Sequence, residues 1–234
     1  MKYMGSKRRI ANEIIEVISK YRKDDDYWVE PFVGGGNIIE KVKGKRIGAD
    51  INKYTIEALI FIRDNVHELP KNNKEFTEED YKKLKLNDDC KFKGFAGFSY
   101  SFGSFWLDTW RRGENRDYVK ESYNSALRQS IKIRDVDFIC CSYLDLHIPK
   151  NSVIYCDPPY KSTEKYNHEI DYEIFWEWCR EKSKNGYKIF ISEYEAPDDF
   201  KCIWEKEISS PLRKNHKKRV EKLFIYNIWF FLKK

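Results

Sequence analysis

The sequence predicts an α/β protein in which parallel strands alternate with crossover helices. Short runs of β-branched and aromatic residues recur along the chain, and most are followed by a stretch with apolar residues at helical spacing. The first run leads into three consecutive glycines, Gly34 to Gly36, as expected where a strand turns sharply. With 234 residues, of which 41% are hydrophobic and 16% aromatic, the chain is long enough for one main domain around one core.

Two repeats of strand and helix are predicted in the amino-terminal part of the chain. In order, we expect a helix over about 7–21, a strand over 27–32, a helix over 37–42, a strand over 46–50 and a helix over 51–66. The carboxy-terminal part continues the alternation. There we expect strands over 138–141, 152–156 and 188–191, a loop over 145–149, a helix over 172–183 and antiparallel closing strands within 220–231.

The segment 70–131 departs from this alternation. It begins with charged residues and continues as a tract of glycines and aromatic residues over 92–110. We therefore predict an insertion beside the sheet, while 1–69 and 132–234 together form the sheet domain. Aromatic side chains in such a tract pack a small subdomain more often than they contact a partner.

The formal net charge of +6 is concentrated in two segments. The segment 91–134 holds nine lysine and arginine residues against four acids, and 213–222 holds six against the single acid Glu221. Basic charge gathered in this way is typical of a protein with a polyanionic partner such as nucleic acid. A solvated charged surface would have the same composition, so charge alone leaves both interpretations open.

Several site classes are excluded by residue spacing. The six cysteines form no Cys-x-x-Cys pair and the histidines show no metal-ligand spacing, so no zinc site, redox motif or other metal centre is expected. The chain has no Gly-x-x-x-x-Gly-Lys-Ser/Thr loop for a nucleoside triphosphate. It shows no apolar run typical of a signal peptide or a membrane span, so we expect a cytoplasmic protein without a membrane partner.

A glycine turn and an acid mark the ends of the first two predicted strands. Residues 30–36 carry the turn, and Asp50 ends the next strand fourteen residues after Gly36. Glycines let a ligand approach the backbone closely, and an acid at this place can accept hydrogen bonds from ribose hydroxyls. The pair suits an adenosine. A tight turn needs glycine whether or not a ligand binds, so the loop alone leaves both interpretations open.

The most specific string is Asp157-Pro158-Pro159-Tyr160, directly after the apolar strand 152–156. The exocyclic amine of adenine is a poor nucleophile because its lone pair is delocalised, so an enzyme that methylates it must hold both amine hydrogens with acceptors. The Asp157 carboxylate and the Pro158 carbonyl can serve, and the prolines keep that carbonyl in place. Tyr160 offers a flat face for an extruded base. The alternative, a plain proline turn, is disfavoured by the nearby glycine loop and acid.

In chain order these motifs resemble those of the Dam-like N6-adenine-specific DNA methyltransferases, especially their compact phage-type members. The similarity covers nearly the full length. Residues 3–7 match the family's amino-terminal cofactor motif, 30–36 its glycine motif, Asp50 its ribose-binding acid and 157–160 its catalytic motif. Many relatives carry an acid at the strand end before the catalytic motif, where this chain has Cys140-Cys141-Ser142-Tyr143.

The resemblance implies a Rossmann-like, S-adenosylmethionine-dependent methyltransferase that modifies N6 of adenine in double-stranded DNA after base flipping, in the cytoplasm of a bacterial or phage-infected cell. It makes 1–69 and 132–234 the catalytic domain and 70–131 an inserted, largely helical target-recognition region. The implied catalytic residues are Asp157, Pro158 and Tyr160. The implied cofactor-binding residues are Tyr3, Gly5, Lys7, Glu30, Phe32, Gly34, Gly36, Asp50, Ser142, Tyr143 and Asp157. The expected DNA-binding residues are Arg111, Arg112, Arg116, Lys217, Lys218 and Arg219.

Two other functions stay open from the sequence. One is a DNA-binding module with a degenerate cofactor site, which the intact set of Tyr3, Lys7, Asp50 and Asp157 disfavours. The other is methylation of RNA or of a protein glutamine amide, although such enzymes more often carry asparagine where this chain has Asp157. None of these functions requires an oligomer.

Overall fold

The computed structural model describes residues 1–87, 90–104, 106–160, 170–208 and 219–226. These residues form a seven-stranded sheet with the order β3-β2-β1-β4-β5-β7-β6. Strands β1 to β5 are parallel to their neighbours, while β7 runs antiparallel to both β5 and β6. The mixed α/β architecture with a Rossmann-like sheet confirms the predicted fold class.

The bounds of most elements agree with the expectations. The strands are β1 (Tyr27–Glu30), β2 (Arg46–Asp50), β3 (Val136–Cys140), β4 (Ser152–Cys156), β5 (Lys188–Glu193), β6 (Phe200–Ile208) and β7 (Arg219–Tyr226). The helices are α1 (Ala11–Ser19), α2 (Lys53–Asn65), α3 (Glu78–Leu86), α4 (Lys93–Ser99), α5 (Tyr118–Lys132) and α6 (Tyr172–Lys184), with short 3₁₀ turns at Ile39–Lys41, Val66–Glu68 and Phe102–Ser104.

Alternate residues of the strands enter two hydrophobic cores, one on each face of the sheet. On one face Trp28, Val153 and Phe190 pack with α1, α2 and α5. On the other face Val29 and Ile154 pack against α6. This period of two follows from the pleat of the strands and explains why both faces of β1 and β4 are apolar.

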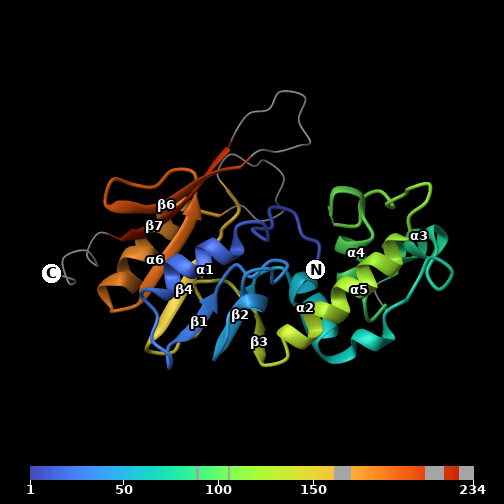
Figure 1. The fold of residues 1–234 in the computed structure, drawn as a ribbon, viewed down its shortest axis with the longest axis horizontal. Helices are drawn as coiled ribbons and strands as arrows, with labels where there is room; N and C mark the ends of the chain where they lie inside the picture. The colour runs from blue at the N-terminus through green and yellow to red at the C-terminus, as the bar shows by residue number, and fades with distance from the viewer. Residues whose placement is uncertain (88–89, 105, 161–169, 209–218, 227–234) are drawn as a thin grey trace.

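The insertion shares the first of these cores. Figure 1 shows α3, α4 and α5 gathered at one end of the molecule, beyond the β3 edge of the sheet. Helix α4 lies directly on α2, and Gly94 allows this close approach because a Cβ at that position would come within 2.4 Å of the Tyr54 carbonyl oxygen. Phe95, Phe98 and Tyr100 are buried there, as a packing role predicts. The division into a catalytic domain and a target-recognition region stays a prediction.

Two expectations were wrong in detail. The helix expected over 37–42 is only the 3₁₀ turn Ile39–Lys41, because the backbone is already extended at Val42 on its way to β2. Strand β6 was not expected at all. It pairs with β7 along the outer edge of the sheet, and every residue after Phe200 is exposed or half-buried, so the strand lacks the apolar pattern of a buried strand. Of the closing segment 220–231, residues 227–231 lie outside the described residues.

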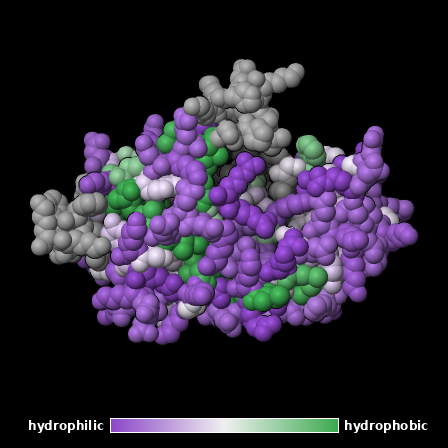
Figure 2. All heavy atoms as spheres, viewed as in Figure 1, coloured by the Kyte–Doolittle hydropathy of each residue, from purple (hydrophilic) through white to green (hydrophobic). Residues whose placement is uncertain are grey.

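Within the described ranges no helix is long and apolar enough to cross a membrane. The face shown in Figure 2 is covered mainly by hydrophilic residues, with apolar residues in small groups between them.

Candidate active site

A cavity of about 950 Å³ opens at the carboxyl ends of β1, β2 and β4. Strand order reverses between β1 and β4, since the chain proceeds from β1 to β2 on one side and reaches β4 on the other. A crevice at this kind of switch point is where open α/β sheets bind their ligands. The motif after β1 and the motif after β4 therefore face each other across one space.

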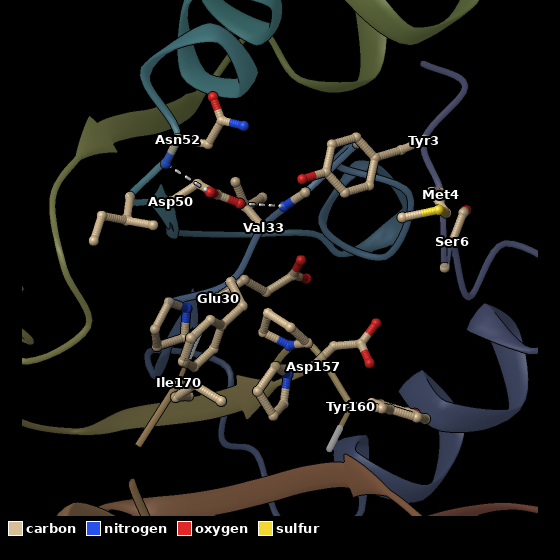
Figure 3. Close-up of a pocket in the computed structure, with 18 of the residues that line it drawn as sticks. Tyr3, Met4, Ser6, Glu30, Val33, Asp50, Asn52, Asp157, Tyr160 and Ile170 are labelled. Carbon is tan, nitrogen blue, oxygen red and sulfur yellow. Dashed lines mark hydrogen bonds between the residues drawn. The ribbon is translucent and has the colours of Figure 1, made fainter. Parts of the chain in front are cut away.

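Asp50 ties the glycine turn to the end of β2. Its Oδ2 accepts a hydrogen bond from the Gly34 amide at 3.0 Å, and its Oδ1 accepts one from the Asn52 amide at 2.9 Å (Figure 3). Gly34 has a φ of +47°, a backbone conformation that L side chains rarely adopt. The ring of Tyr3 lies 3.0 Å from where a Cβ on Gly34 would stand, so the turn leaves no room for a side chain.

Glu30, the last residue of β1, is a buried acid in the cavity wall. The Trp28 indole donates a hydrogen bond of 2.7 Å to its Oε1. Burial raises the pKa of Glu30 to about 8, against the opposing effect of that hydrogen bond. Figure 3 shows its carboxyl group pointing toward the same part of the cavity as that of Asp157. At neutral pH the Glu30 side chain is thus mainly protonated.

Lys7 lies between two carboxylates at the other wall. Its Nζ is 3.1 Å from Asp157 Oδ1 and 3.4 Å from Glu221 Oε2. The three side chains are 8%, 20% and 12% exposed, in that order. Burial acts to lower the pKa of Lys7, but the two carboxylates outweigh it and raise that pKa. Burial raises the pKa of Asp157, while the charge of Lys7 acts to lower it.

Tyr160 is held on three sides. Its hydroxyl donates a 2.9 Å hydrogen bond to Glu221 Oε2. The Lys7 ammonium lies 4.2 Å from the ring centroid, and the Tyr194 ring meets Tyr160 edge to face at 4.5 Å. The Tyr160 ring is therefore covered in part by Lys7 and in part by Tyr194.

The cavity also has an apolar rim. Ile51, Leu144 and Ile174 are 52%, 51% and 49% exposed, and all three line the cavity. Phe32 and Tyr143 lie beside them, with ring centroids 5.2 Å apart. Large apolar side chains gathered and exposed on one concave surface are typical of a site for a flat apolar group.

The insertion supplies the remaining wall. Phe98 of α4 packs on Tyr3 with ring centroids 5.1 Å apart. Trp106, Leu107 and Asp108, which follow α4, also line the cavity. Leu107 has a φ of +46° and its amide donates to the Gly97 carbonyl at 3.1 Å, which turns this short segment back toward the cavity. The segment 70–131 thus contributes directly to the site.

Residues 3–93 match the family model described as D12 class N6 adenine-specific DNA methyltransferase. The chain is 25% identical over 195 residues to the type II methyltransferase M.FokI of Planomicrobium okeanokoites, covering 71% of this chain and 30% of M.FokI. It is 27% identical over 252 residues to M.MjaIII of Methanocaldococcus jannaschii, and this match covers 88% of this chain and 87% of M.MjaIII. It is 26% identical over 192 residues to the DNA adenine methylase of Vibrio cholerae, and this match covers 68% of this chain and 64% of the Vibrio enzyme.

The chain is therefore similar to the D12 class N6 adenine-specific DNA methyltransferases, by the family model over residues 3–93 and by low identity to the enzymes named above. The chain spans under a third of M.FokI and about two thirds of the Vibrio enzyme.

The motifs identified in the sequence meet in space at this cavity, while the role of each residue stays a prediction. The predicted cofactor and catalytic residues that line the cavity are Tyr3, Gly5, Lys7, Glu30, Phe32, Gly34, Asp50, Ser142, Tyr143, Asp157, Pro158 and Tyr160. Gly36 is not among the lining residues. It lies behind the turn, where a Cβ would meet Leu59 and Gln129.

Of the four arginines predicted to bind DNA, the three in the insertion (Arg111, Arg112 and Arg116) do not line the cavity. Arg112 pairs with Glu78, with Nε 2.9 Å from Oε2, and Arg116 pairs with Glu121 through two hydrogen bonds of 2.8 Å. Arg111 and Arg116 both lie on the ring of Tyr118, at 4.1 Å and 4.8 Å. Arg219 does line the cavity, and Lys217 and Lys218 fall outside the described residues.

Several residues in or beside the candidate site were not expected from the sequence. Glu221 and Tyr194 lie against Tyr160, and the Gln129 amide donates a 2.9 Å hydrogen bond to the Gly35 carbonyl. One signal for Glu221 was present. It shares the alternating face of β7 with the buried Leu223 and Ile225, a place where an unpaired acid would be costly. Among the described residues no group of three or more possible ligands could hold a metal ion.

Proposed function

We propose that the protein is an S-adenosylmethionine-dependent DNA methyltransferase that modifies N6 of adenine. One observation carries the proposal: Asp157, Pro158 and Tyr160 follow β4 at the switch point and line the same cavity as Asp50 and the glycine turn. A catalytic motif and a nucleoside-binding motif thus face one space. The family match over residues 3–93 supports the same conclusion from the amino-terminal part alone.

The cavity fits S-adenosylmethionine. Asp50 lines the cavity with a carboxylate, a group that can accept hydrogen bonds from ribose hydroxyls, and the rim of Ile51, Leu144 and Ile174 suits an adenine ring. Acids outnumber the basic residues Lys7 and Arg219 among the lining residues, which favours a ligand with net positive charge. The cofactor supplies a methyl group on a positively charged sulfur, which the N6 lone pair takes as the carbon–sulfur bond breaks and its electron pair stays on sulfur.

The residues of the catalytic motif orient the adenine amine and accept its hydrogens. The Asp157 carboxylate and the Pro158 carbonyl accept the two N6 hydrogens, which orients the nitrogen lone pair toward the methyl group. Positive charge develops on N6 as the bond forms, and the Asp157 carboxylate stabilises it and receives the proton that N6 releases. Lys7, 3.1 Å from Asp157, fixes the orientation of that carboxylate beforehand.

DNA contact is proposed at the arginines of the insertion and at the start of β7. Arg112 and Arg116 have side chains 70% and 55% exposed, so both are accessible to a phosphate despite their partners Glu78 and Glu121. Exposed ion pairs are weak, and a phosphate can replace a carboxylate on an arginine fork. We also propose contacts for Arg111, Arg219, Lys217 and Lys218.

The function is tested by supplying purified protein with methyl-labelled S-adenosylmethionine and unmethylated duplex DNA. The DNA is then digested to nucleosides, and label is expected in N6-methyladenine, located by sequencing. Asp157→Ala is the inactive control. Parallel incubations with RNA and with glutamine-containing peptides test the other acceptor classes. Label in either of these alone would overturn the proposed acceptor. DNA binding with neither cofactor binding nor methyl transfer would indicate a DNA-binding module with a degenerate cofactor site.

A further inference from the structure

The proposed chemistry leaves Glu221 without a role, although this acid reaches the site from β7, the strand next to the β6 edge of the sheet, and makes two contacts there. Its Oε2 accepts from the Tyr160 hydroxyl at 2.9 Å and lies 3.4 Å from Lys7 Nζ. Its side chain is 12% exposed. Glu205 and Glu207 of the neighbouring strand β6 are exposed, so the burial is specific to Glu221.

These contacts close a ring around the catalytic motif. Starting at Asp157, the ion pair leads to Lys7, then to Glu221, then through the hydroxyl to Tyr160, which is three residues from Asp157 along the chain. Lys7 also lies 4.2 Å from the Tyr160 ring. Both ends of the motif are therefore held from one point on β7.

The charges in this ring do not cancel. Lys7 brings one positive charge, while Asp157 and Glu221 bring two carboxylates. With Lys7 paired to Asp157 alone, the site would be neutral where positive charge develops on the amine. The second carboxylate shares the ammonium and leaves an excess of negative charge, which acts at short range in a buried site.

We propose that Glu221 is a positioning residue that fixes Lys7 and Tyr160 around Asp157 and gives the site its excess negative charge. This inference rests on the proposed function. Glu221 contributes a hydrogen bond with Tyr160 and a negative charge beside Lys7, and the two can be tested separately. Tyr160→Phe removes only the hydroxyl contact. Glu221→Gln keeps the shape of the side chain but removes its charge.

The first test measures methyl transfer to unmethylated plasmid DNA by the wild type, Glu221→Gln and the matched control Glu205→Gln on the exposed edge strand. Glu221→Gln is expected to lower kcat about tenfold or more with a smaller change in the KM for DNA, since the lost charge acts chiefly in the transition state. The control should match the wild type. A kcat for Glu221→Gln within twofold of the wild type would overturn the inference.

The pH profile provides a readout that a purely structural role would not move. The charges and titratable groups around Asp157 are Lys7 before α1, Glu30 on β1, Tyr155 on β4, Tyr160, Glu193 on β5 and Glu221 on β7. Glu221 acts to raise the pKa of Asp157. Its neutralisation therefore shifts the acidic limb of the kcat profile to lower pH, even as the plateau falls. An unshifted limb would contradict the electrostatic part.

A binding measurement tests Glu221 even if the chain transfers no methyl group to DNA. By calorimetry without DNA, Glu221→Gln should weaken S-adenosylmethionine, which carries the sulfonium charge, by about threefold or more relative to neutral-sulfur S-adenosylhomocysteine. Glu205→Gln should leave the ratio of the affinities for S-adenosylmethionine and S-adenosylhomocysteine unchanged. If Glu221→Gln weakens both ligands equally, the charge role is overturned. If it lowers the affinity ratio of S-adenosylmethionine to S-adenosylhomocysteine but the wild type methylates no DNA, only the proposed function is overturned.

Discussion

Replacing the buried acid Glu30 by glutamine should stabilise the protein as pH rises. Glutamine has nearly the same shape as a protonated glutamate, and its carbonyl can still accept the hydrogen bond that the Trp28 indole donates at 2.7 Å. Burial raises the pKa of Glu30 from 4.5 to about 8. In the unfolded chain the group ionises near pH 4.5, so between pH 4.5 and 8 the folded state holds a proton that the unfolded state has lost.

The sign and size follow from this difference in bound protons. Stability of the wild type falls as pH rises through the window, because the unfolded state gains ionisation that the folded state lacks. At pH 7 the cost is about 2–4 kcal/mol, and at pH 5 it is about 1 kcal/mol or less. Glu30→Gln removes the cost, so we expect its melting temperature to exceed that of the wild type by about 5–10 °C at pH 7.

The assay is urea unfolding of both proteins at pH 5, 7 and 8 without cofactor, with Glu16→Gln on the exposed face of α1 as the matched control. The difference in the free energy of unfolding between Glu30→Gln and the wild type should widen as pH rises, while the control follows the wild type. A gap that stays constant, or a wild type that gains on the variant as pH rises, would refute the buried protonated state of Glu30.

The remaining predictions concern the proposed roles of the site residues. Asp50→Ala should weaken S-adenosylmethionine about tenfold or more by calorimetry, because a charge-assisted acceptor worth about 1.5–3 kcal/mol is lost; unchanged affinity would remove the ribose assignment. Asp157→Ala should lower turnover about 10²-fold or more with a folded protein by circular dichroism, and retention of more than about a tenth of turnover would contradict its role. Alanine at Arg111, Arg112 or Arg116 should either flatten the salt dependence of DNA binding by about one unit, for a phosphate contact, or relax preference at one base by about 1–3 kcal/mol.

Matched controls separate these effects from loss of stability or of total charge. Asp198, in the exposed turn before β6, serves for the two aspartates. Arg134 precedes β3 and therefore lies at the edge of the sheet opposite the cavity, so Arg134→Ala should leave DNA affinity, salt dependence and site preference unchanged. If the three insertion arginines behave like Arg134, recognition must be sought elsewhere, first at Arg219 and its neighbours.

Local pattern was sufficient for much of the fold and for the half of the site that lies at strand ends. The bounds of β2 and β4 were predicted to the residue, since both are short apolar runs flanked by polar or proline residues. A residue that directly follows a buried parallel strand must emerge at the carboxyl edge of the sheet. The placement of Asp50 and Asp157 at one edge of the sheet therefore follows from the sequence pattern alone.

The parts that depend on contacts between distant segments could not be predicted in this way. The residues of β6 after Phe200 are exposed or half-buried, and the strand exists because its backbone pairs with β7, a pairing that leaves little pattern in the sequence. The arginines of the insertion looked accessible in the sequence, but their ion pairs with Glu78 and Glu121 appear only in the folded chain.

The sequence by itself determined the α/β class, the two strand-end motifs and the family to which the chain is related, because each is written in residues that are neighbours along the chain. Only the tertiary structure decided which charges share the cavity. Glu221 stands in the most basic segment of the sequence, yet the antiparallel pairing of β7 with β5 turns it toward Lys7. Its burial there, with two partners, depends on a contact between residues more than two hundred positions apart.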